Sequence, residues 1–345
     1  MDFNYIENIE SWIGKNTYQE ESYSDIQRLY KLKNQKGYSL SVVFPTLEEE
    51  ATIGTTLNLV IEKLIKEYSL IDELVVIDGG SKDNTIEECN KYSDYIKFVM
   101  QENIIQEINN KGKGEALWKS LNCTTGDIVI YVDSDIKNFS ERFITGILAP
   151  LLLNDDIKFV KGFYKRPYIL SDSNKSNEGG RVTELCARPL LNMLYPELSG
   201  FIQPLGGEYG GFRDVLENLE YTSGYGVEVQ ILIEMLEKYG LNSMAQVNLV
   251  ERIHRHQPIN SLSKMSFAIM QTILKRNVNN SLNNMILIKK LEKENSNFVK
   301  SRSEGQTHCN CNGEDMENSY FKFTTILENV LPTMKSLKNI SEKII

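Results

Sequence analysis

The sequence has no long hydrophobic run, and no apolar stretch approaches the roughly 20 residues that a membrane-spanning helix needs. Its first residues are acidic and do not resemble an export signal. Basic residues are too few to balance the acidic ones, with 38 Lys and Arg against 47 Asp and Glu and a formal net charge of −9. We therefore expect a cytoplasmic protein without a nucleic-acid or membrane partner, which holds any anionic substrate at a local basic site or a metal.

Cysteine and histidine are also scarce. The five cysteines are odd in number and scattered, which predicts reduced thiols and no disulfide framework. The segment His308-Cys309-Asn310-Cys311 has the residue types of half a metal site. No second half is found in the sequence, so we interpret this segment as a loop with incidental thiols.

Two common nucleotide-binding signatures are missing. Phe44-Pro45-Thr46-Leu47 follows the first expected strand, where a dinucleotide-binding fold would carry G-x-G-x-x-G. This difference argues against a dinucleotide-dependent oxidoreductase. The glycine-rich P-loop sequence is absent as well.

A hydrophobic content of 41% and a charged content of 25% predict a soluble protein with a real core. Strands expected near residues 39–44, 73–78, 97–100 and 128–135 alternate with helices. This alternation predicts a mostly parallel, doubly wound, Rossmann-like α/β sheet. We expect a helical arm at 1–36, two halves of one domain at 37–155 and 156–275, and a helical and flexible extension at 276–345.

The second half has a different pattern from the first. We expect a strand at 158–164, a helix at 182–194 that Pro189 ends or kinks, and a helix at 225–238 followed by a strand at 245–249. Residues 203–211 predict a glycine-rich loop that approaches a ligand closely. After a helix at 262–274, we expect a flexible loop at 300–318 and a last helix near 320–340.

The apolar run Ile128–Asp135 ends in two carboxylates, Asp133 and Asp135. A buried parallel strand would bring both to the carboxyl edge of the sheet, where open α/β sheets bind ligands. Such a pair suits a hard divalent ion and its phosphate ligand. The alternative is that Asp133 caps the next turn and Asp135 is solvated.

Other polar residues also follow expected strand ends and can converge on one ligand at that edge. Asp78 can accept hydrogen bonds from a base or a ribose. Lys113, which lies between two glycines, can reach a phosphate, although a solvated helix start is the alternative. The converging set is Glu48, Asp78, Ser81, Lys113, Asp133 and Asp135.

Two further segments carry groups that bind anions or metals. The residues 179–183 offer backbone amides, the guanidinium of Arg181 and the hydroxyl of Thr183 ahead of a helix, which suits a carboxylate or phosphate. The alternative is that Arg181 pairs with Glu184. On a strand, His254 and His256 would share one face and could ligate the same ion as Asp135 or contact a phosphate; an isolated histidine is more often structural.

Several of these motifs resemble a known family. Phe44-Pro45-Thr46-Leu47-Glu48-Glu49, Asp78-Gly79-Gly80-Ser81 and the segment 113–118 resemble GT-A-type nucleotide-sugar glycosyltransferases. Gly180-Arg181-Val182-Thr183-Glu184, Pro204-Leu205-Gly206-Gly207-Glu208-Tyr209 and Gly224-Tyr225-Gly226-Val227-Glu228 are similar to the glucosyl-3-phosphoglycerate synthases, as are the segments 188–191 and 245–249. The resemblance covers roughly residues 39 to 275.

The resemblance implies a reaction. Members of this family transfer glucose from a nucleoside-diphosphate donor, commonly UDP-glucose, to the 2-hydroxyl of 3-phospho-D-glycerate. The anomeric configuration is retained, and the product serves the synthesis of the compatible solute glucosylglycerate. A divalent metal, Mg²⁺ or Mn²⁺, is required, and the enzyme is usually a homodimer.

The resemblance also implies roles for individual residues. The residues 37–155 would bind the nucleotide sugar, and the residues 156–275 would bind the acceptor. Asp135 and His254 would bind the metal, the Leu205 carbonyl would lie near the reacting centre, and Glu228 would contact the sugar. Thr46 and His256 depart from the residues often found in relatives, which are Ala and Asn. The implied donor site comprises Pro45, Thr46, Leu47, Glu48, Asp78, Ser81, Lys113, Asp133, Ser134 and Tyr225, and the implied acceptor site comprises Gly180, Arg181, Thr183 and His256.

Physical reasoning supports the same chemistry, because breaking a sugar–diphosphate bond builds negative charge on the departing phosphate. A metal and Lys113 would stabilise that charge. No second carboxylate is set up as a nucleophile in the sequence, so we favour a front-face mechanism in which the departing phosphate oxygen takes the acceptor proton. The alternatives are a mannosyl-3-phosphoglycerate synthase or another nucleotide-sugar glycosyltransferase, a non-catalytic nucleotide-sugar-binding protein, and a sugar-1-phosphate nucleotidyltransferase.

Overall fold

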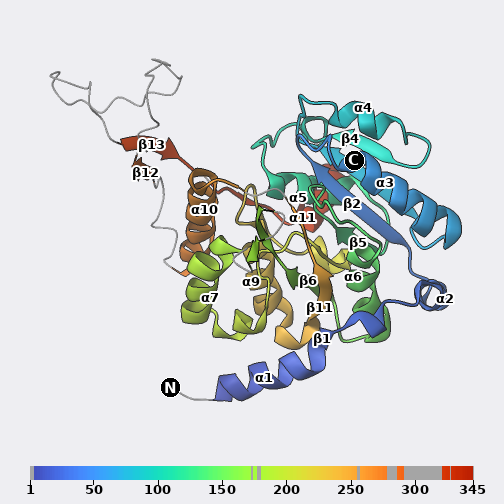
Figure 1. Cartoon of the computed structure of the whole chain (residues 1–345), viewed down its shortest axis with the longest axis horizontal. Coiled ribbons are helices and arrows are strands. Elements are labelled where there is room, and N and C mark those ends of the chain that lie inside the picture. The colour runs from blue at the N-terminus through green and yellow to red at the C-terminus, as the bar shows by residue number, and fades with distance from the viewer. Residues whose placement is uncertain are drawn as a thin grey trace.

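The computed structural model describes residues 4–171, 174–176, 180–254, 257–277, 286–290, 321–326 and 328–344. Its centre is an eight-stranded sheet in the order β1-β11-β6-β9-β5-β2-β3-β4 (Figure 1). Neighbouring strands are parallel except at β9, which is antiparallel to β5 and β6. The strands are β1 (Thr17–Tyr18), β2 (Leu40–Thr46), β3 (Glu73–Asp78), β4 (Lys97–Met100), β5 (Ile128–Tyr131), β6 (Phe159–Lys165), β9 (Tyr209–Phe212) and β11 (Met244–Glu251). This sheet confirms the predicted mostly parallel α/β fold.

Two separate apolar cores pack on the sheet, as expected for a doubly wound fold. One core lies against α2 (Ile26–Lys36), α3 (Ile53–Leu59), the π-helix η2 (Val60–Glu67) and α6 (Arg142–Leu153). The other lies against α5 (Lys113–Cys123), α7 (Arg188–Leu194), α9 (Val227–Tyr239) and α10 (Ile259–Asn277). A short helix, α4 (Thr85–Asn90), links β3 to β4.

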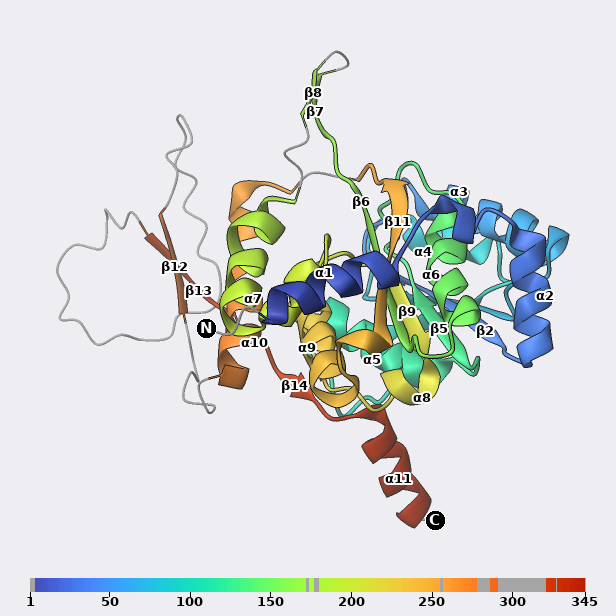
Figure 2. The ribbon, with the colours of Figure 1, turned by 90° about the horizontal axis from the view of Figure 1, so that it is seen from below.

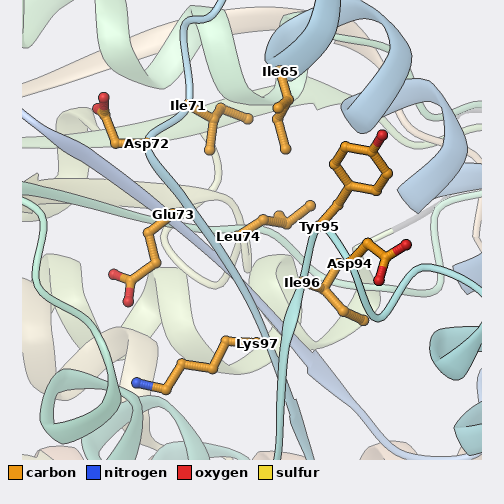
Figure 3. Close-up of a pocket in the computed structure, with 9 residues that line it drawn as sticks. All are labelled: Ile65, Ile71, Asp72, Glu73, Leu74, Asp94, Tyr95, Ile96 and Lys97. Carbon is orange, nitrogen blue, oxygen red and sulfur yellow. The ribbon is translucent and has the colours of Figure 1, made fainter.

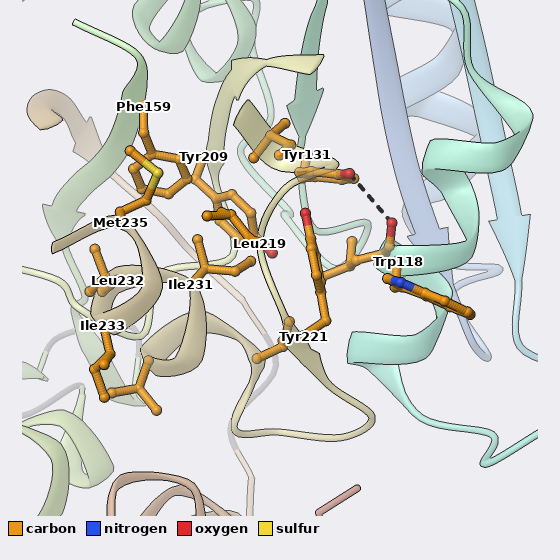
Figure 4. Close-up of a cluster of buried hydrophobic side chains, with 14 of the residues drawn as sticks. Trp118, Tyr131, Phe159, Tyr209, Leu219, Tyr221, Ile231, Leu232, Ile233 and Met235 are labelled. Carbon is orange, nitrogen blue, oxygen red and sulfur yellow. Dashed lines mark hydrogen bonds between the residues drawn. The ribbon is translucent and has the colours of Figure 1, made fainter. Parts of the chain in front are cut away.

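The central strands are apolar on both faces because both faces are covered. All four residues of β5, Ile128 to Tyr131, are fully buried. In the core beside α9, Tyr131 and Tyr209 from the neighbouring strands β5 and β9 lie with their ring centroids 5.2 Å apart (Figure 4). The Tyr131 hydroxyl reaches the Leu117 carbonyl of α5 at 3.4 Å, so this core ties the helix to the sheet.

The N-terminal segment contributes to the sheet as well as to the helical layer. α1 (Asn4–Asn16) leads into β1, which pairs in parallel with β11. The Trp12 indole donates to the Met244 carbonyl at 2.9 Å and packs against Phe201. α1 is therefore anchored to the second half of the chain.

Three elements differ from the sequence-based expectation. The expected loop at 203–211 is wrong at its end, because Tyr209–Phe212 is strand β9. A Cβ on Gly210 would lie 2.7 Å from the Val129 carbonyl oxygen, so this glycine permits close strand packing and no ligand approach. β5 ends at Tyr131, before the two aspartates. Pro189 does not end its helix, since the π-helix η4 (Thr183–Ala187) leads directly into α7 with Pro189 in the first turn.

The C-terminal region also differs in part. The last helix, α11, covers Met334–Ile344 and follows the short strand β14 (Val330–Leu331), which pairs with β10 (Tyr221–Thr222). The expected flexible loop at 300–318 lies outside the described residues. Across the described ranges, no helix has the length and hydrophobicity to span a membrane.

Candidate active site

Asp78, at the carboxyl end of β3, organises two loops at this edge of the sheet. Its buried carboxylate accepts hydrogen bonds from the Thr46 hydroxyl at 2.8 Å and the Ser81 hydroxyl at 2.6 Å. It also accepts from the backbone N–H groups of Gly80 at 2.8 Å and Ser81 at 2.7 Å. These four bonds occupy both oxygens of the carboxylate. In this state Asp78 shapes the loops after β2 and β3, and a small polar hollow opens beside it, lined by Asp78, Gly79, Gly80, Gln101, Glu102, Asn109 and Lys111.

The loop after β2 bends at Glu48, which has a left-handed φ of 59°. The Glu48 N–H donates to the Ser81 hydroxyl at 2.9 Å, which fixes the bend. A non-glycine residue in this conformation is strained, and such strain is common at functional sites. Leu47 beside it is exposed, while Pro45 accepts a hydrogen bond from the Ser134 hydroxyl at 2.7 Å.

Lys113 begins α5 and joins both halves of the chain. Its Nζ lies 2.7 Å from Asp133 Oδ1 and 2.7 Å from Glu228 Oε1 in the first turn of α9. Burial alone would lower the pKa of Lys113, but the two carboxylates outweigh it and raise that pKa above the usual lysine range. Lys113 is therefore a fixed positive charge, in contrast to the solvated helix start that was the alternative.

Arg252, directly after β11, completes a charge cluster that the sequence analysis missed. Its Nη2 lies 3.0 Å from Asp133 Oδ2 and 2.5 Å from Asp135 Oδ1, and its Nη1 lies 3.0 Å from the buried Glu208. Burial would raise the pKa of Asp133, but Lys113 and Arg252 hold it well below its usual range. Asp133 is thus held charged, and both aspartates pair with the same guanidinium, which relieves their mutual repulsion.

Lys161, which was also not predicted from the sequence, supports the loop that carries Leu205. The buried Lys161 Nζ, on β6, donates to the Gly206 carbonyl at 2.6 Å. Burial lowers the pKa of Lys161 to about 8, although nearby carboxylates oppose the shift. A Cβ on Gly207 would lie 2.2 Å from Asp133 Oδ2, so the backbone of this loop passes directly beside the aspartate. The half-buried Leu205 therefore belongs to the same site.

The segment expected to bind an anion begins at Gly180, with a left-handed φ of 85°, and continues into η4. The Thr183 hydroxyl is buried, and the described residues supply no hydrogen-bond partner for it. Arg181 Nη2 donates to the Gln257 carbonyl at 3.2 Å. Glu184 forms a two-bond ion pair with Arg188, at 2.8 and 3.1 Å.

The two histidines are placed differently from the expectation. β11 ends at Glu251, so His254 follows the strand and does not lie on it, and it is half-buried. His256 lies outside the described residues. The expectation of a shared strand face is therefore wrong for His254, because the strand ends where Arg252 turns towards the aspartates.

The donor set fits a hard divalent cation. Mg²⁺ in phosphate-transfer sites is commonly held by one or two carboxylates together with substrate phosphates. Asp135 supplies such a carboxylate, with its side chain 28% exposed and one oxygen facing Arg252. In the described part of the chain, no group of three or more His, Cys, Asp or Glu side chains forms a closed metal cage. Both observations are consistent with a metal site whose remaining coordination positions are filled by oxygens of the substrate.

A hollow of about 420 Å³ lies at the opposite end of the sheet, at the amino ends of β3 and β4 (Figure 3). Three of the charged side chains that line it are paired within the protein. Asp72 pairs with Lys33 at 2.5 Å, Glu73 accepts from Ser41 at 2.6 Å, and Lys97 donates to the Cys123 carbonyl at 2.7 Å. The chemistry of the molecule is therefore concentrated at the carboxyl edge.

The chain is similar to known proteins over most of its length. The family model "Glycosyl transferase family 2" matches residues 41–177. The glucosyl-3-phosphoglycerate synthase of Petrotoga mobilis is 44% identical over 265 residues, which are 76% of this chain and 81% of that protein.

Solved structures of similar proteins contain ligands. The Mycobacterium tuberculosis glucosyl-3-phosphoglycerate synthase, solved with Mn²⁺ and UDP-glucose, has a TM-score of 0.75 and 34% identity over 93% of this chain and 98% of that one. The same enzyme with phosphoglyceric acid has a TM-score of 0.76 and 34% identity, covering 93% and 99%. The mannosyl-3-phosphoglycerate synthase of Rubrobacter xylanophilus has a TM-score of 0.77 and 28% identity, covering 95% and 98%.

Proposed function

This chain belongs to the family of glucosyl-3-phosphoglycerate synthases, and from that premise we propose that it transfers glucose from UDP-glucose to the 2-hydroxyl of 3-phospho-D-glycerate. The observation that carries the proposal is the cluster in which Lys113 lies between Asp133 and Glu228, beside Asp135 and Arg252. A transferase that expels a diphosphate needs fixed positive charge at the carboxyl edge of the sheet, and this cluster supplies it.

On this proposal the nucleotide sugar lies along the ends of β2, β3 and β5. The base lies at the edge of the sheet beside Asp78, next to the loops that Glu48 and Ser81 join by a hydrogen bond. Asp133 and Ser134 contact the ribose and diphosphate, and Tyr225 and Glu228 contact the glucose. Pro45, Thr46 and Leu47 complete the wall of the nucleotide pocket.

Mg²⁺ or Mn²⁺, held by Asp135 and His254, would neutralise charge on the departing diphosphate. Lys113 supports the same charge with an ammonium that stays protonated because Asp133 and Glu228 raise its pKa against the effect of burial. The Leu205 carbonyl would lie near the reacting centre, next to Gly206, whose carbonyl accepts a hydrogen bond from Lys161.

Glucose transfer with retention proceeds on one face of the sugar on this proposal. The nearby Glu228 and Glu208 are committed to Lys113 and Arg252, so neither is free to act as a nucleophile. The departing phosphate oxygen then takes the proton of the acceptor hydroxyl. A glycosyl–enzyme adduct trapped on a carboxylate would contradict this route.

The acceptor binds at the turn formed by Gly180, Arg181 and Thr183, with His256 as a further contact. The support is the left-handed φ of Gly180 and the buried Thr183 hydroxyl, for which the described residues offer no partner. Arg181 supplies the charge for a ligand that carries a carboxylate and a phosphate.

We also propose that the protein acts in the cytoplasm as a homodimer. The free, buried thiols of Cys89, Cys123 and Cys186 support a reducing compartment. The four segments with boundaries at residues 36, 155 and 275 remain our proposed organisation, with the donor and acceptor halves meeting where Glu228 pairs with Lys113.

The structural similarity to a mannosyl-3-phosphoglycerate synthase makes GDP-mannose the alternative donor. Purified protein is incubated with 3-phosphoglycerate, Mg²⁺ or Mn²⁺ and each of several nucleotide sugars, and nucleoside diphosphate release and product mass are measured. We expect release of UDP and a glucosylated product. Release with GDP-mannose alone would identify the mannosyl enzyme, pyrophosphate release would indicate a nucleotidyltransferase, and no release with any donor would indicate a binding protein.

A further inference from the structure

Residues 328–332, here called the C-terminal strap, lie outside the region of family resemblance yet contact the donor site. β14 within the strap pairs with β10, and α11 beyond it packs against α5 (Figure 2). The Trp118 indole of α5 donates to the Pro332 carbonyl at 2.8 Å. The strap is therefore attached to the element that begins with Lys113.

Glu328 is the buried carboxylate of this strap, with an exposure of 3%. Its Oε2 accepts a hydrogen bond from the Gly224 N–H at 3.0 Å. Next to it, the Ser223 N–H donates to the Asn329 carbonyl at 2.9 Å, and the Asn329 N–H donates to the Ser223 hydroxyl at 3.2 Å. Hydrogen bonds from the strap therefore fix the loop at residues 223–226.

This loop in turn fixes the start of α5. The Ser223 carbonyl accepts from the Glu115 N–H at 3.0 Å. A Cβ on Gly112 would lie 2.2 Å from the Ser223 oxygen, and a Cβ on Gly114 would lie 1.9 Å from the Thr222 oxygen. Gly112 is therefore packed directly on the loop that Glu328 holds, and Gly114 is packed on Thr222 just before that loop.

The same loop carries Tyr225 and leads into α9, which places Glu228 2.7 Å from the Lys113 Nζ. From these contacts we infer that Glu328 is a positioning residue for nucleotide-sugar binding. Its carboxylate fixes residues 223–226, and these set the positions of Lys113, Tyr225 and Glu228. The inference rests on the proposed function for the identity of the ligand. The role of Glu328 in fixing residues 223–226 does not depend on which ligand binds.

The test is Glu328→Gln, which keeps the shape and presents an amide N–H₂ where one acceptor oxygen stood. Burial raises the pKa of the Glu328 carboxyl to about 7, so the comparison is made at pH 8, where it is charged. Because hydrogen bonds to a charged acceptor are the stronger ones, we expect the Kd for UDP-glucose with Mn²⁺, measured by calorimetry at that pH, to rise roughly five- to tenfold. The KM for 3-phosphoglycerate should stay within about twofold, since the hydrogen bonds of Glu328 join it to Gly224 and to Lys275 of α10. Equal changes in both constants would overturn the inference.

A second measurement does not depend on the ligand. Hydrogen–deuterium exchange of the peptide covering residues 223–226 should become roughly tenfold faster in Glu328→Gln. Unchanged exchange would overturn the positioning role whatever the substrate is. If wild-type protein bound no nucleotide sugar while the exchange still rose, the proposed function would fail and the mechanical role of Glu328 would stand.

Lys338→Met is the matched control. Lys338, in α11, pairs with Glu217 at 2.6 Å and tests whether loosening the C-terminal segment elsewhere has the same effect. We expect wild-type exchange at 223–226 and wild-type affinity. Gly224→Ala is a second variant, because its Cβ would lie 2.5 Å from Glu328 Oε1 and must displace the carboxylate. It should weaken UDP-glucose binding in the same direction, and an unchanged Kd in both Gly224→Ala and Glu328→Gln would refute the inference.

Discussion

Arg252 sets the charge balance of the site. Four carboxylates, those of Asp133, Asp135, Glu208 and Glu228, face three cations, those of Lys113, Lys161 and Arg252. Arg252 therefore pairs with three of these carboxylates, those of Asp133, Asp135 and Glu208, while Lys113 pairs with Asp133 and Glu228. Asp135 is the more accessible of the two aspartates, with 28% of its side chain exposed against 18% for Asp133.

Asp135→Ala is expected to abolish turnover, with a loss of at least about a thousandfold in kcat, because the carboxylate proposed to hold the metal is removed. The fold should survive, since Arg252 keeps its partners Asp133 and Glu208. Turnover, Mn²⁺ binding by electron paramagnetic resonance and the circular dichroism spectrum are compared with wild type. Near-normal activity would remove Asp135 from the metal site.

Arg181→Ala should raise the KM for 3-phosphoglycerate at least about tenfold and leave that for UDP-glucose within about twofold. The guanidinium is proposed to bind the anionic acceptor and not the nucleotide sugar, so its removal should affect only the acceptor. Arg28→Ala, at an exposed arginine of α2, is the control and should change neither constant. Equal shifts in both constants would disprove the assignment of this turn to the acceptor.

Glu328 also gives a prediction for stability against pH. Burial raises the pKa of its carboxyl from 4.5 to about 7, although backbone N–H groups of residues 224–226 oppose the shift. Between these values the folded chain binds a proton that the unfolded chain has released. The resulting stability is fully present below pH 4.5 and is lost as the pH rises through 7.

The side chain in Glu328→Gln cannot ionise, so the stability of this variant should not depend on pH through residue 328. From pH 4.5 to 8, the free energy of unfolding of wild type should fall by about 3 kcal/mol relative to the variant. Urea unfolding at both ends of this range measures the difference. Lys338→Met provides the reference for changes elsewhere in the segment, and a wild-type-to-Gln difference that is constant with pH would contradict the prediction.

Among single residues, Lys113 and the two aspartates of the cluster were predicted from the sequence, whereas Arg252, Lys161 and Glu208 were missed. Asp133 and Asp135 follow an apolar run, so the strand-end argument locates them. Arg252 directly follows β11, so its position at a strand end also indicates the site, although the histidines nearby in the sequence are the more conspicuous ligands. Lys161 and Glu208 lie in or beside strands. The role of a charged residue at such a position cannot be inferred until its partners on the neighbouring strands are known.

At the scale of elements, the start of α5 is fixed by close backbone contact and not by side-chain capping. Gly114→Ala would place a Cβ 1.9 Å from the Thr222 carbonyl oxygen, so helix and loop must separate. We expect a loss of roughly 2–3 kcal/mol in the free energy of unfolding, together with reduced turnover. Gly14→Ala is the matched control, because this exposed glycine of α1 has no atom within 4 Å of the added Cβ.

Gly14→Ala should instead stabilise the protein by about 0.5–1 kcal/mol through helix propensity. Thermal and urea unfolding of both variants give the comparison. Destabilisation of the same size in both would show that the close contact at Gly114 has no special weight.

The elements of the first half were predictable because each strand is a continuous apolar run and each crossover is a helix. β3 and β4 have the predicted boundaries, 73–78 and 97–100. β9 was not predictable, since Gly210 and Gly211 indicate close approach of backbone without indicating which backbone approaches. Only the antiparallel insertion between β5 and β6 identifies the partner as the sheet itself.

At the scale of the whole molecule, the two predicted halves are interleaved. β9 from the second half lies beside β5 from the first, and β1 from the N-terminal arm forms an edge next to β11. One apolar core contains Val43 and Val75 together with Ile231 and Met244. The halves therefore share one sheet and one set of cores, which sequence composition on either side of residue 155 does not reveal.

This shared core predicts that residues from both halves unfold together. Calorimetry should give one endotherm, with calorimetric and van't Hoff enthalpies in agreement. UDP with Mn²⁺ at about 100 times its Kd should stabilise the folded chain by roughly 2.7 kcal/mol and move the whole transition upward. UDP without a divalent ion is the control and should give a smaller shift. Two resolved transitions, with only one displaced by UDP and Mn²⁺, would mean that the donor half folds independently of the rest.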